Sequence, residues 1–294
     1  MDKIKEYIRE FFIIFFLGMI IFSGFNIVRI GLEYKKGEDT YNEASQEVEL
    51  EVEKETSLDL SLVTDEGDSE DIEDNILDMI ASGVAPEDIK METEEKEEAI
   101  SLSVNWDKFN DKVIGWIKID GNDIINYPVV QSFDNEYYLK HLYDDTYNSS
   151  GSIFVSKKNN GFKDKHIVIH GHNLKNGTMF TSLKNYLKQD YVDEHRYIYI
   201  AEPNGKTRVF YVYSCFTTHS LGEEDGFNAY TVNFADKSSY SLWINQTVEK
   251  SQIESILKVT RANNILTLST CMSRGDKYER CVVHAVEIEN VIKK

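Results

Sequence analysis

The amino-acid sequence predicts a mainly β domain with helices, an α+β fold in which about eight strands close into a barrel. About eight short runs between residues 102 and 294 have the alternation, or the β-branched and aromatic content, of strands, and turn residues separate them. Stretches with helical spacing interrupt these strands. Roughly 190 residues are enough for one hydrophobic core, so we expect a single closed or nearly closed β-barrel.

The N-terminal part of the chain contains an apolar run at residues 11–28. A run of this length is at the lower limit for a helix that crosses ~30 Å of hydrocarbon. A cleaved signal peptide is the alternative, but no Ala-x-Ala-like site follows the run. We therefore expect residues 1–32 to be an uncleaved, single-pass membrane anchor. Basic residues lie on both sides of the run, so charge alone does not give its orientation.

An acidic segment follows the predicted anchor. Residues 47–98 hold 21 Asp and Glu against three Lys, a net charge of −18, whereas the whole chain has −19. The low isoelectric point therefore describes this segment and not the β domain. Because the acids lack the spacing of a calcium-binding loop, we expect residues 33–101 to be an extended, solvated linker. Apolar residues between positions 72 and 80 predict at most a short transient helix within it.

The β domain is expected over residues 102–294, with its elements in a definite order. Apolar positions from Val104 to Trp116 predict a short N-terminal helix, and those of 178–188 and 238–257 predict a second helix and a long one before the last two strands. Pro128 restricts its strand to an edge or a bulged position. The expected strands are 116–119, 124–131, 152–155, 166–170, 197–201, 207–216, 265–271 and 280–286.

The last two strands form a predicted hairpin that carries the candidate chemistry. In residues 265–271, leucines alternate with small hydroxyl residues. Since alternate side chains of a strand point to opposite faces, the leucines should face the core, while Thr267, Ser269 and Cys271 should line a groove. After a turn, the returning strand would bring Arg280 beside Cys271.

Cys271 is the candidate nucleophile. A thiol with an ordinary pKa of ~8.5 is only a few per cent thiolate at neutral pH, so it needs a cation and an acid or base nearby. Arg280 can supply permanent positive charge, and His172, in the loop after an apolar run, is the first candidate for the acid and base. His170 and His284 are alternatives. By strand parity, His170 lies on the same face as His172, and His284 lies on the same face as Arg280. An isolated cysteine is more often a buried structural residue.

The residues around this cysteine resemble the sortases. The resemblance depends on Thr-Leu-Ser-Thr-Cys (267–271) with Arg280 nine residues further on, and on Gly-His-Asn (171–173) after an apolar strand. Asp-Lys-Val-Ile-Gly-Trp-Ile-Lys-Ile (111–119) and Ile-Asn-Tyr-Pro-Val-Val-Gln (125–131) resemble class B of this Gram-positive family. A sortase is a membrane-anchored cysteine transpeptidase that cuts a sorting signal after threonine and passes the acyl group to an amine.

The resemblance covers roughly residues 102–292 and implies a role for each candidate residue. It implies that Cys271 is the nucleophile, His172 the acid and base, and Arg280 the group that stabilises the oxyanion and the substrate. It also implies a catalytic domain outside the cell membrane, a surface-protein sorting peptide as donor, and no cofactor. The acceptor would be an amine of a peptidoglycan precursor or a pilin lysine.

By the same resemblance, the sorting peptide lies in a groove beside the catalytic hairpin, and its motif is similar to Asn-Pro-x-Thr. Met272 stands directly after Cys271, where some relatives have an acidic residue, so no acidic contribution is expected at that position. The residues expected to contact the peptide are Asn135, Leu139, Thr217, Tyr230 and Ser269.

Other functions remain as alternatives to a wall-anchoring enzyme. A pilin-polymerising sortase would use the same chemistry, as would a hydrolytic cysteine protease. A noncatalytic wall-associated scaffold would keep the barrel and bind through the acidic linker, but it has no need of Cys271, His172 and Arg280 together. No glycine-rich phosphate loop, basic patch or zinc-ligand spacing supports a nucleotide, nucleic-acid or metal site. Three cysteines are too few, and odd in number, for a disulfide framework.

Overall fold

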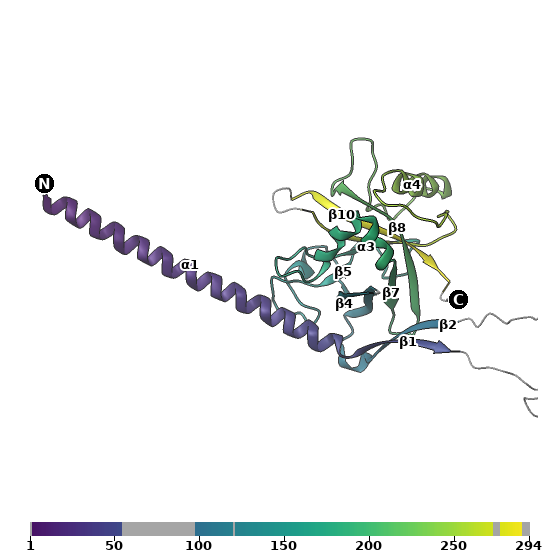
Figure 1. Cartoon of the computed structure of the whole chain (residues 1–294), viewed down its shortest axis with the longest axis horizontal. Coiled ribbons are helices and arrows are strands. Elements are labelled where there is room, and N and C mark those ends of the chain that lie inside the picture. The colour runs from purple at the N-terminus through teal and green to yellow at the C-terminus, as the bar shows by residue number, and fades with distance from the viewer. Residues whose placement is uncertain (1, 55–97, 120, 273–276, 290–294) are drawn as a thin grey trace, which may run out of the picture. The chain divides into compact units, whose positions relative to one another are not determined.

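The structure is a computed structural model that describes residues 2–54, 98–119, 121–272 and 277–289 (Figure 1). Within these residues, eight strands form a closed barrel in the order β10-β8-β7-β3-β4-β5-β6-β9, which confirms the predicted fold class. The barrel strands are β3 Val113–Ile119, β4 Asn122–Gln131, β5 Ile153–Val155, β6 His166–His170, β7 Tyr197–Ala201, β8 Thr207–His219, β9 Ile265–Cys271 and β10 Glu279–Ile288.

Short helices interrupt the strands. The helix expected over 178–188 is a 3-10 helix and not an α-helix. The helix expected from Val104 has only three residues, because Val113 already belongs to β3. The long helix expected before the last hairpin is present but ends at Glu249. The helices of the domain are η3 Trp106–Lys108, η4 Tyr137–Leu139, η5 Phe180–Leu187, α3 Gln189–Glu194 and α4 Lys237–Glu249.

The strand that contains Pro128 is not at an edge. β4 pairs with β3 on one side and with β5 on the other. However, the ladder with β5 begins only at Val129, and the register with β3 shifts between Val113 and Gly115. A proline, which has no amide hydrogen to donate, is tolerated beside such an irregularity. β4 is therefore a bulged strand inside the sheet, as one of the two predicted alternatives states, and not an edge strand.

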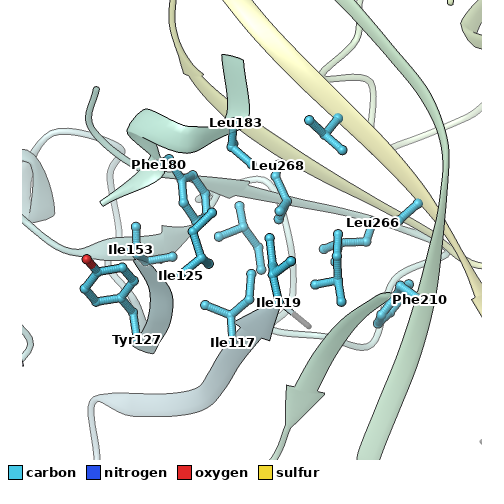
Figure 2. Close-up of a cluster of buried hydrophobic side chains, with 14 of the residues drawn as sticks. Ile117, Ile119, Ile125, Tyr127, Ile153, Phe180, Leu183, Phe210, Leu266 and Leu268 are labelled. Atoms are coloured by element: carbon cyan, nitrogen blue, oxygen red, sulfur yellow. The ribbon is translucent and has the colours of Figure 1, made fainter. Parts of the chain in front are cut away.

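The interior of the barrel is one hydrophobic cluster to which all eight strands contribute. Figure 2 shows part of it, including Leu266 and Leu268 of β9 beside Phe210 and Leu183. The two leucines therefore face the core, as their alternation predicts. Their neighbours in sequence point to the outer face of the barrel, where the functional groups lie.

Helix α4 covers part of that outer face. It begins with a capping box, in which Asp236 and Ser239 exchange side-chain and backbone hydrogen bonds. Its buried apolar residues, among them Trp243, belong to a second hydrophobic cluster with Val168 of β6 and Val282 of β10. Helix α4 thus buries an apolar part of the outer face, whereas the cavity described below lies outside the area that it covers.

The N-terminal helix α1 runs from Asp2 to Ser45 and contains the apolar run. Its residues 7–45 include an 18-residue window of mean hydropathy 2.5 whose side chains are exposed, so the helix is long and apolar enough to cross a membrane. It also extends beyond residue 32, so residues 33–45 are helical and not an extended linker. The Tyr41 hydroxyl is buried and donates to the Gly151 carbonyl at 2.7 Å. Packing against the loop before β5 explains why the helix continues.

The acidic segment is described only at its ends. Strands β1 Val48–Lys54 and β2 Glu98–Val104 pair with each other in a two-stranded sheet. Residues 55–97, including the short helix predicted between positions 72 and 80, lie outside the described part of the chain.

Candidate active site

A cavity of about 360 Å³ opens on the outer face of the barrel, where β6 and β9 end. These two strands pair in parallel, and their register places His170 beside Ser269. The cavity therefore collects the last residues of both strands and the loops that follow them. It is lined by Asn135, Leu139, Phe154, Ser156, Lys158, His170, Gly171, His172, Ser220, Asn228, Tyr230, Ser269, Thr270, Cys271 and Arg280.

The antiparallel pairing of β9 and β10 makes Cys271 and Arg280 direct partners across the ladder. Directly opposite residues point to the same side of a sheet, so the thiol and the guanidinium share one wall of the cavity. Cys271 is a free, half-buried cysteine. The guanidinium donates to the carbonyl oxygens of Lys277 at 2.7 Å and of Glu279 at 3.0 Å. These bonds hold one edge of the guanidinium group. Among the described residues, no carboxylate forms an ion pair with Arg280.

The imidazole of His172 is oriented by a backbone carbonyl. Its Nε2 lies 2.9 Å from the oxygen of Leu139. A carbonyl oxygen only accepts, so Nε2 carries a hydrogen, and Nδ1 is the ring nitrogen available for proton exchange. Gly151 makes room for this arrangement: a Cβ there would lie 3.0 Å from His172 Cδ2 and 2.6 Å from the Tyr138 oxygen, and its φ is +61°.

The loop that carries His172 is hydrogen-bonded to the end of β9 on both sides of the histidine. Before it, the Gly171 amide donates to the Ser269 carbonyl at 3.1 Å, and the Thr270 hydroxyl donates to the Gly171 carbonyl at 2.9 Å. After it, Asn173 Nδ2 donates to the Cys271 carbonyl at 2.8 Å. Hydrogen bonds from one main-chain amide and two side chains to main-chain carbonyl groups thus position the imidazole relative to the thiol. Asn173 has no role in the sequence prediction, although it belongs to the Gly-His-Asn motif.

His170 lies between the rings of Phe154 and Tyr230, with centroid distances of 5.3 and 5.7 Å. Burial, followed by the positive charges of Arg280 and Lys158, lowers the pKa of His170 to about 4. This imidazole is therefore neutral at neutral pH and is poorly suited to deliver a proton there.

Comparison with protein families supports the cysteine-based active site that the geometry indicates. The model of the sortase domain matches residues 117–288, more than half of the chain. The chain belongs to the sortase family. The sortase B of Listeria monocytogenes is 34% identical over 176 residues, which cover 59% of this chain and 68% of the relative.

Solved sortase structures agree with this assignment. A Staphylococcus aureus sortase B–substrate complex has 30% identity and a TM-score of 0.56, covering 62% of this chain and 82% of that one. A sortase B complexed with triglycine has 30% identity and a TM-score of 0.55, covering 64% and 83%. This chain is thus a class B sortase, which is a cysteine transpeptidase acting on surface proteins.

Four of the five residues expected to contact the sorting peptide of this sortase line its cavity: Asn135, Leu139, Tyr230 and Ser269. The hydroxyls of Tyr230 and Ser269 are hydrogen-bonded to each other at 2.9 Å, and burial raises the pKa of Tyr230 to about 12. Both groups are therefore neutral at neutral pH.

Thr217, the fifth expected contact residue, does not line the cavity. In the ladder between β8 and β10, Thr217 pairs with Cys281, which faces the core, whereas Thr218 pairs with Arg280. Thr218 is therefore the β8 residue on the face of Arg280, and the expected contact by Thr217 receives no support from the cavity.

Two other residues of the sortase expected near the cavity lie instead beneath α4. Thr267 and His284 are fully buried and share a hydrogen bond of 2.7 Å, and Thr267 also bonds His166 Nε2 at 2.7 Å. The indole of Trp243 covers both histidines, with centroid distances of 4.3 and 5.5 Å. Strand parity correctly predicts the face of the sheet on which Thr267 and His284 lie. However, α4 separates this part of the face from the cavity. His284 is therefore not placed to act on Cys271.

The other two cysteines of the sortase lie inside the barrel. Cys215 and Cys281 are fully buried, and their sulfur atoms are 3.9 Å apart. Burial raises the pKa of Cys215. Buried structural cysteines are inert, so the reactive candidate is Cys271.

Proposed function

We propose that this sortase cleaves the sorting signals of surface proteins after threonine, through a thioacyl-enzyme at Cys271, and transfers the acyl group to a cell-wall amine. The single observation that carries the proposal is the direct pairing of Cys271 with Arg280 in a cavity that His172 also lines. A noncatalytic scaffold would gain nothing from this combination.

In the first half-reaction, the thiol proton passes to Nδ1 of His172 while the sulfur of Cys271 attacks the carbonyl carbon of the substrate threonine. Arg280 donates to the oxygen that becomes negative. The carbon–nitrogen bond then breaks, and His172 returns the proton to the leaving amine. A positioned proton donor of this kind contributes typically ~10²–10⁴-fold to the rate.

In the second half-reaction, an acceptor amine attacks the thioester. The amine loses a proton to His172, the carbon–sulfur bond breaks, and the thiol is regenerated as the new amide leaves. The solved complexes of sortase B with a substrate and with triglycine support a peptide donor and an amine acceptor. The class B resemblance supports a donor motif similar to Asn-Pro-x-Thr.

We also propose that residues 1–32 are a single-pass membrane anchor, that residues 46–101 form an acidic linker, and that residues 102–294 are a catalytic domain outside the membrane. The exposed apolar side chains of α1 support the anchor. The membership of the chain in a cell-surface enzyme family supports the orientation.

The test is intact-mass spectrometry of the full chain incubated with peptides that contain Asn-Pro-x-Thr. We expect an adduct with the mass of the acyl fragment on the wild type and none on Cys271→Ala. Triglycine should remove the adduct and appear in a ligated product. The pilin alternative predicts that a pilin lysine peptide replaces triglycine as the better acceptor. Cleavage without any adduct, or an adduct on Cys271→Ala, would exclude the proposed mechanism.

A further inference from the structure

The charged side chains that line the cavity are all cationic. Among the described residues, Lys158 and Arg280 carry charge into it, and no Asp or Glu is part of its wall. Residues 47–98 hold −18 of the net charge of −19, so the rest of the chain is close to neutral and its acidity does not extend to the cavity. The position directly after Cys271 adds no negative charge, because it is occupied by Met272.

The two cations act on the same part of the cavity. Arg280 stands opposite Cys271 at the end of β9, and Lys158 follows β5, the strand that pairs with β6 at His170. Both charges lower the pKa of His170, in addition to the larger effect of its burial. The field at this imidazole is therefore positive, and the imidazole itself is neutral at neutral pH.

Neither cation is neutralised by an acid of the described chain. The guanidinium of Arg280 bonds main-chain carbonyl oxygens, and none of the ion pairs between described residues involves Lys158. The preceding residue, Lys157, provides a contrast, because its charge acts on Asp134 and it does not line the cavity. A ligand with a carboxylate would thus find two available cations beside the reactive thiol.

We propose that the preferred donor peptide carries a carboxylate side chain on the residue directly before the threonine, so that x in the sorting motif is Glu or Asp. This inference rests on the proposed function, because the threonine carbonyl must lie at Cys271. The proposal places the side chain of the preceding residue, ~3.3 Å further along an extended peptide, in the part of the cavity lined by His170 and the two cations.

The expected size of the preference follows from the exposure of the two cations. Partly exposed ion pairs contribute modestly, and two of them together predict that a Glu peptide has a kcat/KM about 3- to 10-fold above that of its Gln isostere. Salt screens such pairs, so the ratio should approach one as ionic strength rises.

The experiment measures kcat/KM of the full chain for three peptides that differ only at x, with Glu, Gln or Lys. The wild type should prefer Glu over Gln and Gln over Lys at low salt. Lys158→Glu should reduce the Glu:Gln ratio below one and favour the Lys peptide. The matched control Lys157→Glu makes the same change of charge one residue away, and it should retain the preference for Glu.

Equal values for the Glu and Gln peptides, within twofold, would overturn the inference while leaving the proposed function intact. So would a Glu:Gln ratio that Lys158→Glu does not change. Cleavage of none of the three peptides, with no adduct at Cys271, would overturn the proposed function and the inference with it.

Discussion

At the scale of single residues, the candidate site depends on a glycine. Gly151 has a left-handed backbone conformation, and its missing side chain leaves space for the His172 ring and for the carbonyl groups of Tyr138 and Leu139. The Leu139 carbonyl in turn accepts the Nε2 hydrogen of His172. The tautomer of the proposed acid and base is therefore set by a position remote in sequence.

We expect Gly151→Ala to reduce peptide cleavage by about 10-fold or more, because the new methyl group must displace the Leu139 segment or the imidazole. The matched control is Gly161→Ala, which has a similar φ of +55° but open space around the Cβ. The control should lose some stability through backbone strain and retain its kcat/KM. Steady-state cleavage and thermal unfolding of both variants separate the two effects. Equal activity of the two variants would contradict this role for Gly151.

The buried histidines beneath α4 predict a pH-dependent stability. Burial lowers the pKa of His166 to about 4 and lowers that of His284 well below its ordinary value. The unfolded chain, with a His pKa of 6.5, binds more protons, so stability is complete above pH 6.5 and is lost as the pH falls toward 4. Each histidine contributes up to ~1.4 kcal/mol per pH unit within this window.

Urea unfolding of the protein lacking residues 1–30, between pH 7.5 and 5, measures this effect. The free energy of unfolding should fall as the pH decreases, and His166→Gln should reduce the slope. A free energy that stays constant across this range would contradict the burial of two neutral histidines.

At the scale of elements, sequence patterns predicted what depends on local alternation. Alternation predicts that the leucines of strand 265–271 point inward, and a short connection predicts that Arg280 lies beside Cys271. What the sequence missed depends on contacts between distant segments. Helix α4 covers Thr267 and His284, although nothing in their own strands indicates a cover. The Thr217 expectation came from family resemblance and not from parity, which favours Thr218.

The end of α1 is another contact between distant segments. The Tyr41 hydroxyl donates to the Gly151 carbonyl at 2.7 Å and lies 3.0 Å from Ser152 Oγ. The first of these two partners is the glycine that makes room for His172, and the second is its neighbour in sequence. The last turns of α1 therefore stabilise the back of the candidate site.

Tyr41→Phe should destabilise the domain by about 1 kcal/mol, since it leaves a buried carbonyl without its donor. Chemical unfolding of a protein lacking residues 1–30 measures the loss. Thr40→Val is a suitable control, because the Thr40 hydroxyl donates within the helix, to the Lys36 carbonyl. Identical stabilities of Tyr41→Phe and its parent would show that this contact contributes nothing.

At the scale of the whole molecule, one helix joins two environments. Residues 11–28 of α1 expose large apolar side chains, whereas residues near its end pack against the barrel. We expect the full chain to require detergent for extraction and the protein lacking residues 1–30 to be soluble, folded and active on sorting peptides. Fractionation of cells followed by a cleavage assay tests both statements. Recovery of the full chain in a salt-washed soluble fraction would contradict the anchor.

The central claim is that Cys271, Arg280 and His172 form one catalytic unit, and peptide cleavage by single variants tests it most directly. Cys271→Ala should abolish cleavage, and Arg280→Lys should reduce kcat by about 10²–10³-fold because it keeps the charge but loses the planar fork. His172→Ala should cost ~10²–10⁴-fold. Cys281→Ser, inside the barrel, is the control and should change stability more than kcat. Cleavage by Cys271→Ala at the wild-type rate would contradict the account.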